Sequence, residues 1–233
     1  MKCVIWAVVV FAVIVAAAPE PESYDFRAKY PDCVLPISTA SAGAKIQAVV
    51  TAKVLSERFC VVQKTRLRLS WADLQSCDVT IPPGLGWEYC ARVGICTADC
   101  YGNITVGTCP KECADHSVKK LYRVQPTSIK RYKTEAEIQA AVRVDGPVEA
   151  TMEIFEDFLT YRGGVYTHSS GKLLGMMAVS IVGWGNAGTT PFWICTMEWG
   201  TQWGESGYFR ILRGKDHCGI ERSAIAGLPW PKP

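Results

Sequence analysis

The sequence predicts an α+β fold in which a helical first half precedes a strand-rich second half. A long helical pattern spans 42–59, where Ile46, Val50 and Val54 repeat every four residues. Apolar and polar residues alternate over 148–154, which is the period of a half-buried antiparallel strand. Because helices and strands occupy separate halves of the chain, we expect two lobes rather than repeated βαβ units.

Caps and breaking residues predict the other elements of the first half. Ser70 and Asp73 are spaced as in a capping box that opens a short helix. The run Pro82-Pro83-Gly84 separates it from a second helix at 87–92. The cysteine-rich stretch 96–113 is expected to be a loop.

In the second half, Thr134 caps a helix that runs to about 144 and is ended by Gly146-Pro147. Glycines separate the strands that follow. Besides 148–154, strands are expected at 164–168, 177–185, 192–197 and 207–213.

The N-terminus is typical of a cleaved secretion signal. Lys2 precedes an almost wholly apolar run over 4–15, and small residues before position 18 supply a cleavage site. The run is too short to span a bilayer, and no second long apolar run follows. Residues 1–17 are therefore predicted to be a signal peptide. The domain at 18–233 should enter the secretory pathway and reach the extracellular space or a lysosomal or endosomal lumen.

Composition and charge exclude several classes of function. The 233 residues are 48% hydrophobic and 20% charged, which suits one packed core and argues against disorder. The formal charge is +3 and no basic run stands out, so nothing indicates a nucleic-acid partner.

Cysteines are abundant, and only Cys3 of the 11 lies in the signal. Secretion permits disulfides among the others. Five crowd between positions 90 and 113, but their spacings match no paired zinc motif and no histidine pair accompanies them. We expect no metal or other cofactor. The sequon at Asn103 predicts a glycosylated surface loop in the same region.

Several blocks carry a more specific pattern. They are YDFR at 24–27, DGPVE at 145–149, GVYTH at 164–168, WGTQWGESGYF at 199–209 and ILRGKDHCGIE at 211–221. Together they resemble the cathepsin B-like peptidases of the papain family, over about residues 24–229. The resemblance implies a papain-like fold with a helical left lobe at about 24–120, a β-barrel right lobe at about 121–229, and a cleft between them.

In that family, a cysteine at the N-terminus of the central helix attacks the peptide carbonyl. A histidine pairs with it, an asparagine orients the histidine, and a glutamine helps to form the oxyanion hole. Counting back from Cys60 places Ala40 at the glutamine and Ile46 at the nucleophile. Met177 takes the histidine position and Met197 the asparagine position. None of these side chains can attack a carbonyl or transfer a proton, so the resemblance implies a peptidase fold without its chemistry.

The resemblance also bears on disulfides and on two missing segments. It implies the bridges Cys33–Cys60, Cys77–Cys109 and Cys100–Cys113, with Cys90–Cys96 as a guess and Cys195 and Cys218 left as thiols. The occluding loop of the family is missing from 97–113. The mature-like start follows the signal almost directly, so we expect no inhibitory propeptide within the chain.

We interpret the chain as an inactive, monomeric homologue whose cleft binds a peptide, a cystatin-like inhibitor or a propeptide. The residues expected to line that cleft are Met176, Gly183, Trp184, Trp199 and Trp203. By composition alone, the methionines and tryptophans would be ordinary core residues. Two alternatives stay open, namely a hydrolase with a rebuilt site and a structural protein with a vestigial cleft. If the alignment holds, Ile46, Met177 and Met197 should converge at the base of the cleft.

Overall fold

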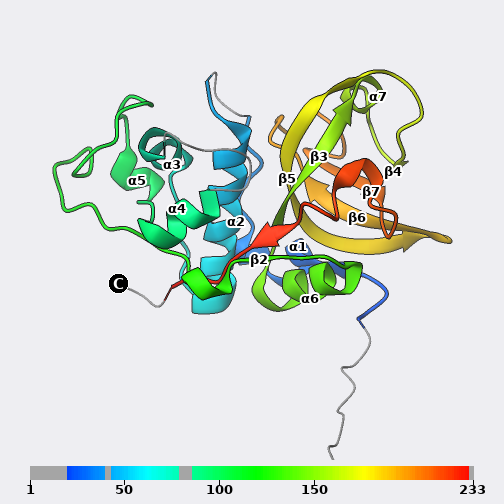
Figure 1. Ribbon diagram of the computed structural model, residues 1–233, viewed down its shortest axis with the longest axis horizontal. Coiled ribbons are helices and arrows are strands. Elements are labelled where there is room, and N and C mark those ends of the chain that lie inside the picture. The colour runs from blue at the N-terminus through cyan, green and yellow to red at the C-terminus, as the bar shows by residue number, and fades with distance from the viewer. Residues whose placement is uncertain (1–19, 40–42, 79–85, 231–233) are drawn as a thin grey trace, which may run out of the picture.

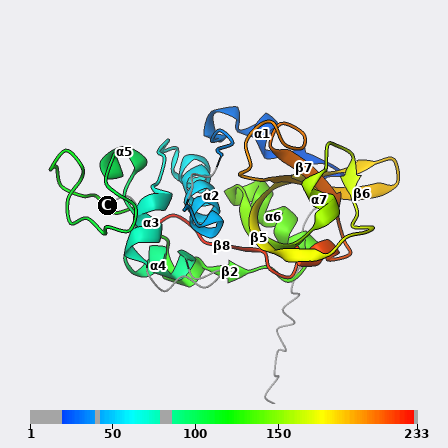
Figure 2. The ribbon, with the colours of Figure 1, turned by 90° about the horizontal axis from the view of Figure 1, so that it is seen from above.

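The computed structural model describes residues 20–39, 43–78 and 86–230 (Figure 1). The three described helices between Trp71 and Tyr101 lie on one side of a long central helix, and the strands lie on its other side together with the remaining helices (Figures 1 and 2). The helices are α1 (Phe26–Lys29), α2 (Ile46–Gln63), α3 (Trp71–Cys77), α4 (Gly86–Arg92), α5 (Ala98–Tyr101), α6 (Glu135–Asp145) and α7 (Glu156–Leu159). Short 3₁₀ turns occupy Pro31–Cys33, Pro126–Ser128 and His217–Gly219. The predicted signal peptide, Ala40 and the proline break lie outside the described residues.

The central helix α2 is buried on nearly every face because it lies between the helical half and the sheet. Its buried residues include polar ones, among them Lys53, Glu57 and Arg58. It starts and ends about one turn later than the predicted range 42–59. A helix that is buried on all sides lacks a polar face, so the apolar pattern does not show where the helix begins or ends. No helix within the described residues is long and apolar enough to cross a membrane.

Arg58 fastens α2 to distant parts of the chain. Its guanidinium donates from Nε to the Pro147 carbonyl at 2.7 Å and from Nη1 to the Gly227 carbonyl at 3.2 Å. One turn further on, Gln63 donates to the Trp230 carbonyl at 2.6 Å. These bonds, of which the two from Arg58 are buried, connect the helix to the residue before strand Val148–Phe155 and to the C-terminal segment.

The smaller helices follow the predicted caps. Ser70 accepts a hydrogen bond from the Asp73 backbone N–H at 3.0 Å and opens α3, as expected. The short helix α5 lies within the stretch predicted to be loop, where Thr97 accepts from the Cys100 N–H at 3.2 Å. Asn103 is exposed in the turn that follows α5.

Three disulfides form as the resemblance implied, joining Cys33 to Cys60, Cys77 to Cys109 and Cys100 to Cys113. The guessed Cys90–Cys96 bridge is wrong, because both side chains are free, buried thiols. They belong to different hydrophobic clusters, Cys90 to the main core and Cys96 to a smaller one with Tyr101.

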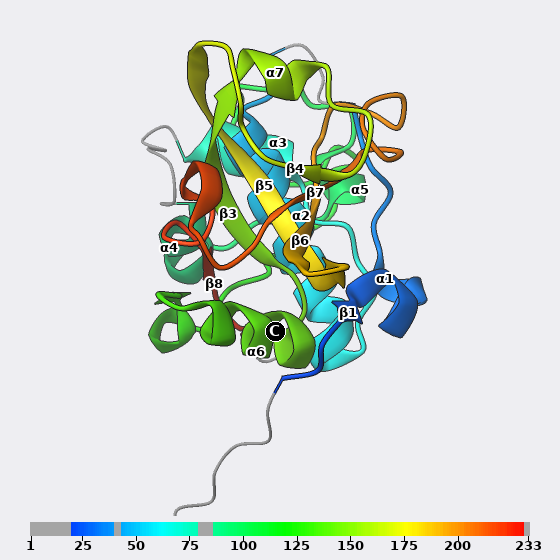
Figure 3. The same cartoon turned by 90° about the vertical axis from the view of Figure 1, so that its right-hand side faces the viewer.

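The strands of the described residues form an eight-stranded sheet. They are β1 (Tyr24–Asp25), β2 (Lys130–Arg131), β3 (Val148–Phe155), β4 (Val165–Tyr166), β5 (Leu173–Ala187), β6 (Thr190–Thr196), β7 (Tyr208–Leu212) and β8 (Ile225–Ala226). The order is β2-β8-β3-β5-β6-β7-β4, with β1 added on β5, and α6 and α7 lie at opposite ends of the sheet (Figure 3). Because this path does not return to its first strand, the sheet is open where the resemblance implied a barrel.

Candidate binding cleft and its substituted positions

Ile46 is the first residue of α2, at the position where the resemblance puts the nucleophile. A helix N-terminus presents unpaired N–H groups that would lower the pKa of a thiol. The isoleucine is half-buried and packs against the main hydrophobic core. The preceding Lys45 has no side-chain cap bond and places a cation where the helix dipole favours an anion.

The resemblance puts Met177 at the histidine position and Met197 at the asparagine position, and both side chains are apolar. Met177 on β5 pairs across the sheet with Met152 on β3 and is half-buried. Met197 is fully buried, and its backbone N–H donates to the Gly207 carbonyl at 2.9 Å. Both methionines and Ile46 lie in or against the same hydrophobic cluster. Met176 is 61% exposed and points away from Met177, because neighbouring residues of a strand face opposite sides.

Gly183 and Trp184 lie beneath the N-terminal segment. β1 pairs Tyr24 with Trp184 and Asp25 with Gly183. The Trp184 ring stacks on Tyr24 at 5.1 Å, and its indole N–H donates to the Pro21 carbonyl at 2.9 Å. A Cβ on Gly183 would come within 2.3 Å of the Tyr24 carbonyl oxygen, which explains the glycine. Neither residue presents a free surface to a ligand.

Trp199 and Trp203 belong to an aromatic cluster around Phe158. The two indoles meet edge to face at 5.0 Å, and Trp203 lies 4.9 Å from Phe158. Trp203 is buried and donates to the Leu159 carbonyl at 3.2 Å. Trp199 is partly exposed, so it is the predicted cleft tryptophan that keeps surface for a ligand.

The free thiols offer no ready replacement nucleophile. All four within the described residues are buried. Burial raises the pKa of Cys96 to about 12 and of Cys218 to about 11. It raises the pKa of Cys90 and Cys195 as well, so these groups stay protonated near neutrality.

The histidines are engaged elsewhere. His168 places Nδ1 3.1 Å from an Asp157 carboxylate oxygen and stacks on Phe155 at 3.7 Å. Its backbone N–H donates to His217 Nε2 at 2.8 Å. His116 is exposed and pairs with Glu112. No group of His, Cys, Asp and Glu side chains in the described part of the chain could hold a metal ion.

A buried carboxyl network beside Ile46 was missed by the sequence reasoning. Glu149 on β3 is 1% exposed and accepts hydrogen bonds from Thr51 Oγ1 at 2.6 Å and Trp87 Nε1 at 3.1 Å. Gln47 also donates to it. Burial raises the pKa of Glu149 to about 7. The strand alternation marked Glu149 as solvent-facing, and no local signal shows that α2 and α4 cover that face.

A second buried network lies lower on α2. Lys53 donates to the Leu35 carbonyl at 2.9 Å and lies 3.6 Å from a Glu57 oxygen and 3.7 Å from Glu198 Oε1. Burial opposes its charge, but the two carboxylates outweigh that effect and raise the pKa of Lys53. Glu198 Oε2 accepts from the Ser38 backbone N–H at 2.8 Å and from its hydroxyl at 2.7 Å.

Residues 20–228 match the family model described as papain family cysteine protease. The chain therefore belongs to the papain family. Within that family it is cathepsin B-like.

Two curated relatives and two solved structures illustrate the relationship. "Cathepsin B-like cysteine proteinase 4" of Caenorhabditis elegans is 32% identical over 252 residues, which cover 90% of this chain and 75% of the relative. The "Cathepsin B-like cysteine proteinase" of Schistosoma japonicum is 32% identical over 250 residues, 89% of this chain and 73% of the relative. "proCathepsin B S9 from Trypanosoma congolense" superposes with a TM-score of 0.85 at 33% identity, covering 95% of this chain and 82% of that one. Procathepsin L 3 of Tenebrio molitor, at 20% identity and a TM-score of 0.74 over 94% of this chain and 73% of that one, shares the fold.

Proposed function

We propose that this protein is a proteolytically inactive cathepsin B-like homologue of the secretory pathway that binds peptide-like ligands. The observation that carries the proposal is the isoleucine at the first position of α2, where the family has its nucleophile. Loss of the nucleophile from a comparable triad lowers turnover by about 10⁶-fold. Met177 and Met197 add apolar side chains at the positions of the base and its orienting amide.

The described thiols and histidines offer no substitute for the lost cysteine and its base. The free thiols are buried with raised pKa values, and both sheet-side histidines are held in a cluster with Asp157. An activated cysteine needs a partly exposed thiolate beside a base. The proposal therefore excludes the hydrolase with a rebuilt cysteine site.

Binding is supported by what the cleft region keeps. The N-terminus of α2 still presents backbone N–H groups, and Trp199 remains partly exposed. An extended peptide, a cystatin-like inhibitor or a separate propeptide would find hydrogen-bond donors and an aromatic surface there without being cleaved.

Activity is tested with the purified mature protein and fluorogenic dipeptide substrates between about pH 4 and pH 8. We expect no turnover above buffer. A matched variant that restores all four positions (A40Q, I46C, M177H and M197N) serves as the control for the scaffold. Turnover by the natural protein would contradict the proposal, and its loss in Ser41→Ala would assign that turnover to Ser41, a serine that precedes Ile46 in the sequence.

Ligand binding is tested separately by calorimetric titration with a cystatin-type inhibitor and with a cathepsin B propeptide. We expect saturable binding that weakens on Trp199→Ala. An absence of heat with both ligands would contradict the binding half of the proposal and leave its inactive half standing.

A further inference from the structure

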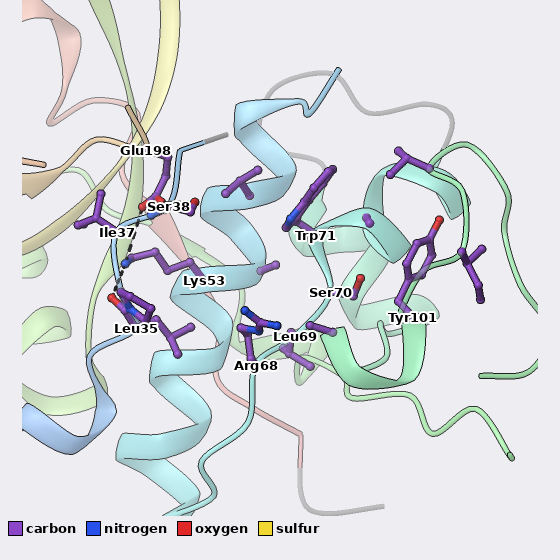
Figure 4. Close-up of a pocket in the computed structure, with 18 residues that line it drawn as sticks. Leu35, Ile37, Ser38, Lys53, Arg68, Leu69, Ser70, Trp71, Tyr101 and Glu198 are labelled. Atoms are coloured by element: carbon purple, nitrogen blue, oxygen red, sulfur yellow. Dashed lines mark hydrogen bonds and ion pairs between the residues drawn. The ribbon is translucent and has the colours of Figure 1, made fainter. Parts of the chain in front are cut away.

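A cavity of about 360 Å³ opens on the flank of α2, below the N-terminal turn that holds Ile46. Residues 35–38 form one wall, and segments from 68–72 and 98–106 of the helical half form the other (Figure 4). Ile46, Met177, Met197 and Trp199 do not line it. The cavity therefore does not include these substituted positions or the exposed tryptophan, and its volume suits a small molecule.

The walls are mostly apolar. Their larger side chains are Leu35, Ile37, Val49, Leu69, Trp71 and Tyr101. Trp71 and Tyr101 stand on the side of the cavity opposite Leu35 and Ile37 (Figure 4). An aromatic ring or a branched alkyl group would be desolvated between these walls.

One end of the cavity is polar and built from buried charges. Glu198 is 1% exposed, and its carboxylate points toward Ser38 and Lys53 (Figure 4). Ser38 donates two hydrogen bonds to Glu198 Oε2, one from its backbone N–H and one from its hydroxyl. Oε1 has no hydrogen-bond partner among the described residues, and its closest cation is the Lys53 ammonium at 3.7 Å.

The charge balance at this end is negative. Among the described residues that line the cavity, Lys53 is the buried cation, and it is shared between Glu57 and Glu198, whereas the second lining cation, Arg68, is exposed. Its own hydrogen bond goes to the Leu35 carbonyl instead of either carboxylate. A buried carboxylate oxygen without a donor is strongly unfavourable, and a ligand that supplies a charged donor would relieve it.

We propose that this cavity binds a small primary amine with an apolar, ring-sized body. The ammonium group would donate to Glu198 Oε1 and balance the second carboxylate, while the body would pack between Ile37 and Trp71. A neutral alcohol of the same shape would keep the apolar contacts and lose the charge. An acid of the same shape would meet Glu198 with like charge and be excluded.

The test uses three probes of one shape, namely phenethylamine, 2-phenylethanol and 3-phenylpropionate, added to the isotope-labelled mature protein near pH 7. Binding is followed by the amide and indole NMR signals. We expect the amine to bind at least about tenfold more tightly than the alcohol, and the acid not to bind. The shifts should gather at Trp71, Ala52 and Ser38.

Two variants locate the interaction. Glu198→Gln keeps the shape and removes the charge, so amine affinity should fall about tenfold while alcohol affinity stays. Ala52→Leu fills the cavity and should abolish binding of both the amine and the alcohol. Glu205→Gln is the matched control, because that carboxylate pairs with Arg210 in the sheet half, and it should leave binding unchanged.

Equal affinity for amine and alcohol, or shifts centred on Ile46 and Trp199, would overturn the assignment. Both outcomes are measured on the natural protein, so they test amine binding in the cavity even if a variant fails to fold. Neither outcome depends on whether the cleft binds peptides.

Discussion

Replacing Glu149 by glutamine should remove a large part of the pH dependence of stability. The carboxyl group is almost fully buried between α2, α4 and β3, and burial raises its pKa from 4.5 to about 7. Between these two values the folded protein keeps a proton that the unfolded chain releases. The stability tied to this proton is fully present below about pH 4.5 and is lost as the pH rises through about 7.

The magnitude follows from the size of the shift. Each pKa unit corresponds to about 1.4 kcal/mol, so the natural protein should lose about 3 kcal/mol through Glu149 between acid and slightly alkaline pH. Glu149→Gln stays neutral and can still accept from Thr51 and Trp87. Its free energy of unfolding should therefore match the natural protein at acid pH and exceed it by about 3 kcal/mol above neutrality.

Urea unfolding at a series of pH values, followed by tryptophan fluorescence, measures this difference. Glu137→Gln is an informative control, because its exposed carboxylate pairs with Lys130 and its pKa is lowered to about 2. Its contribution has the opposite sign, being present above the unfolded pKa and lost in acid. Parallel stability curves for Glu149→Gln and the natural protein would show that Glu149 does not cause this pH dependence.

Substitutions in α2 and at its disulfide should also change stability or reactivity. Arg58→Met removes the guanidinium that donates to three buried carbonyls, those of Gly146, Pro147 and Gly227, and should lower the free energy of unfolding by about 3 kcal/mol. The control Arg66→Met removes an exposed ion pair and should lower it by less than about 1 kcal/mol. Ile46→Cys should react with a thiol reagent in the native state, unlike the buried thiols, yet show no proteolysis, because no imidazole accompanies it. Serine at both Cys33 and Cys60 should lower stability by about 3 kcal/mol in the same assay, given the 27-residue separation.

Local signals in the sequence located most elements within a few residues. The capping serine at position 70, the Gly146-Pro147 stop and the alternation over 148–154 each describe chemistry that acts between near neighbours. The bounds of α2 and the length of β5, which starts at Leu173, depend instead on what packs against them.

In the candidate site, too, sequence motifs predicted residue identities but not the packing of distant segments. Motif spacing assigned Ile46, Met177 and Met197, and the structure places Met197 in the main hydrophobic core with Ile46 and Met177 packed against that core. That the three side chains meet at the base of one cleft stays a prediction. Motifs do not show which residues become buried under segments that are distant in the sequence. The N-terminal strand hides Trp184, and α2 and α4 turn Glu149 into a buried acid.

The bonds that Arg58 and Gln63 make also constrain when the protein can fold. Both side chains lie on the central helix, and their carbonyl partners at Gly227 and Trp230 come almost at the end of the chain. The partners are separated by 169 and 167 residues, so these contacts close some of the longest loops in the molecule. The core around α2 therefore stays incomplete until the segment that carries Gly227 and Trp230 is in place, so the helical half does not complete its packing before the sheet half has been synthesised.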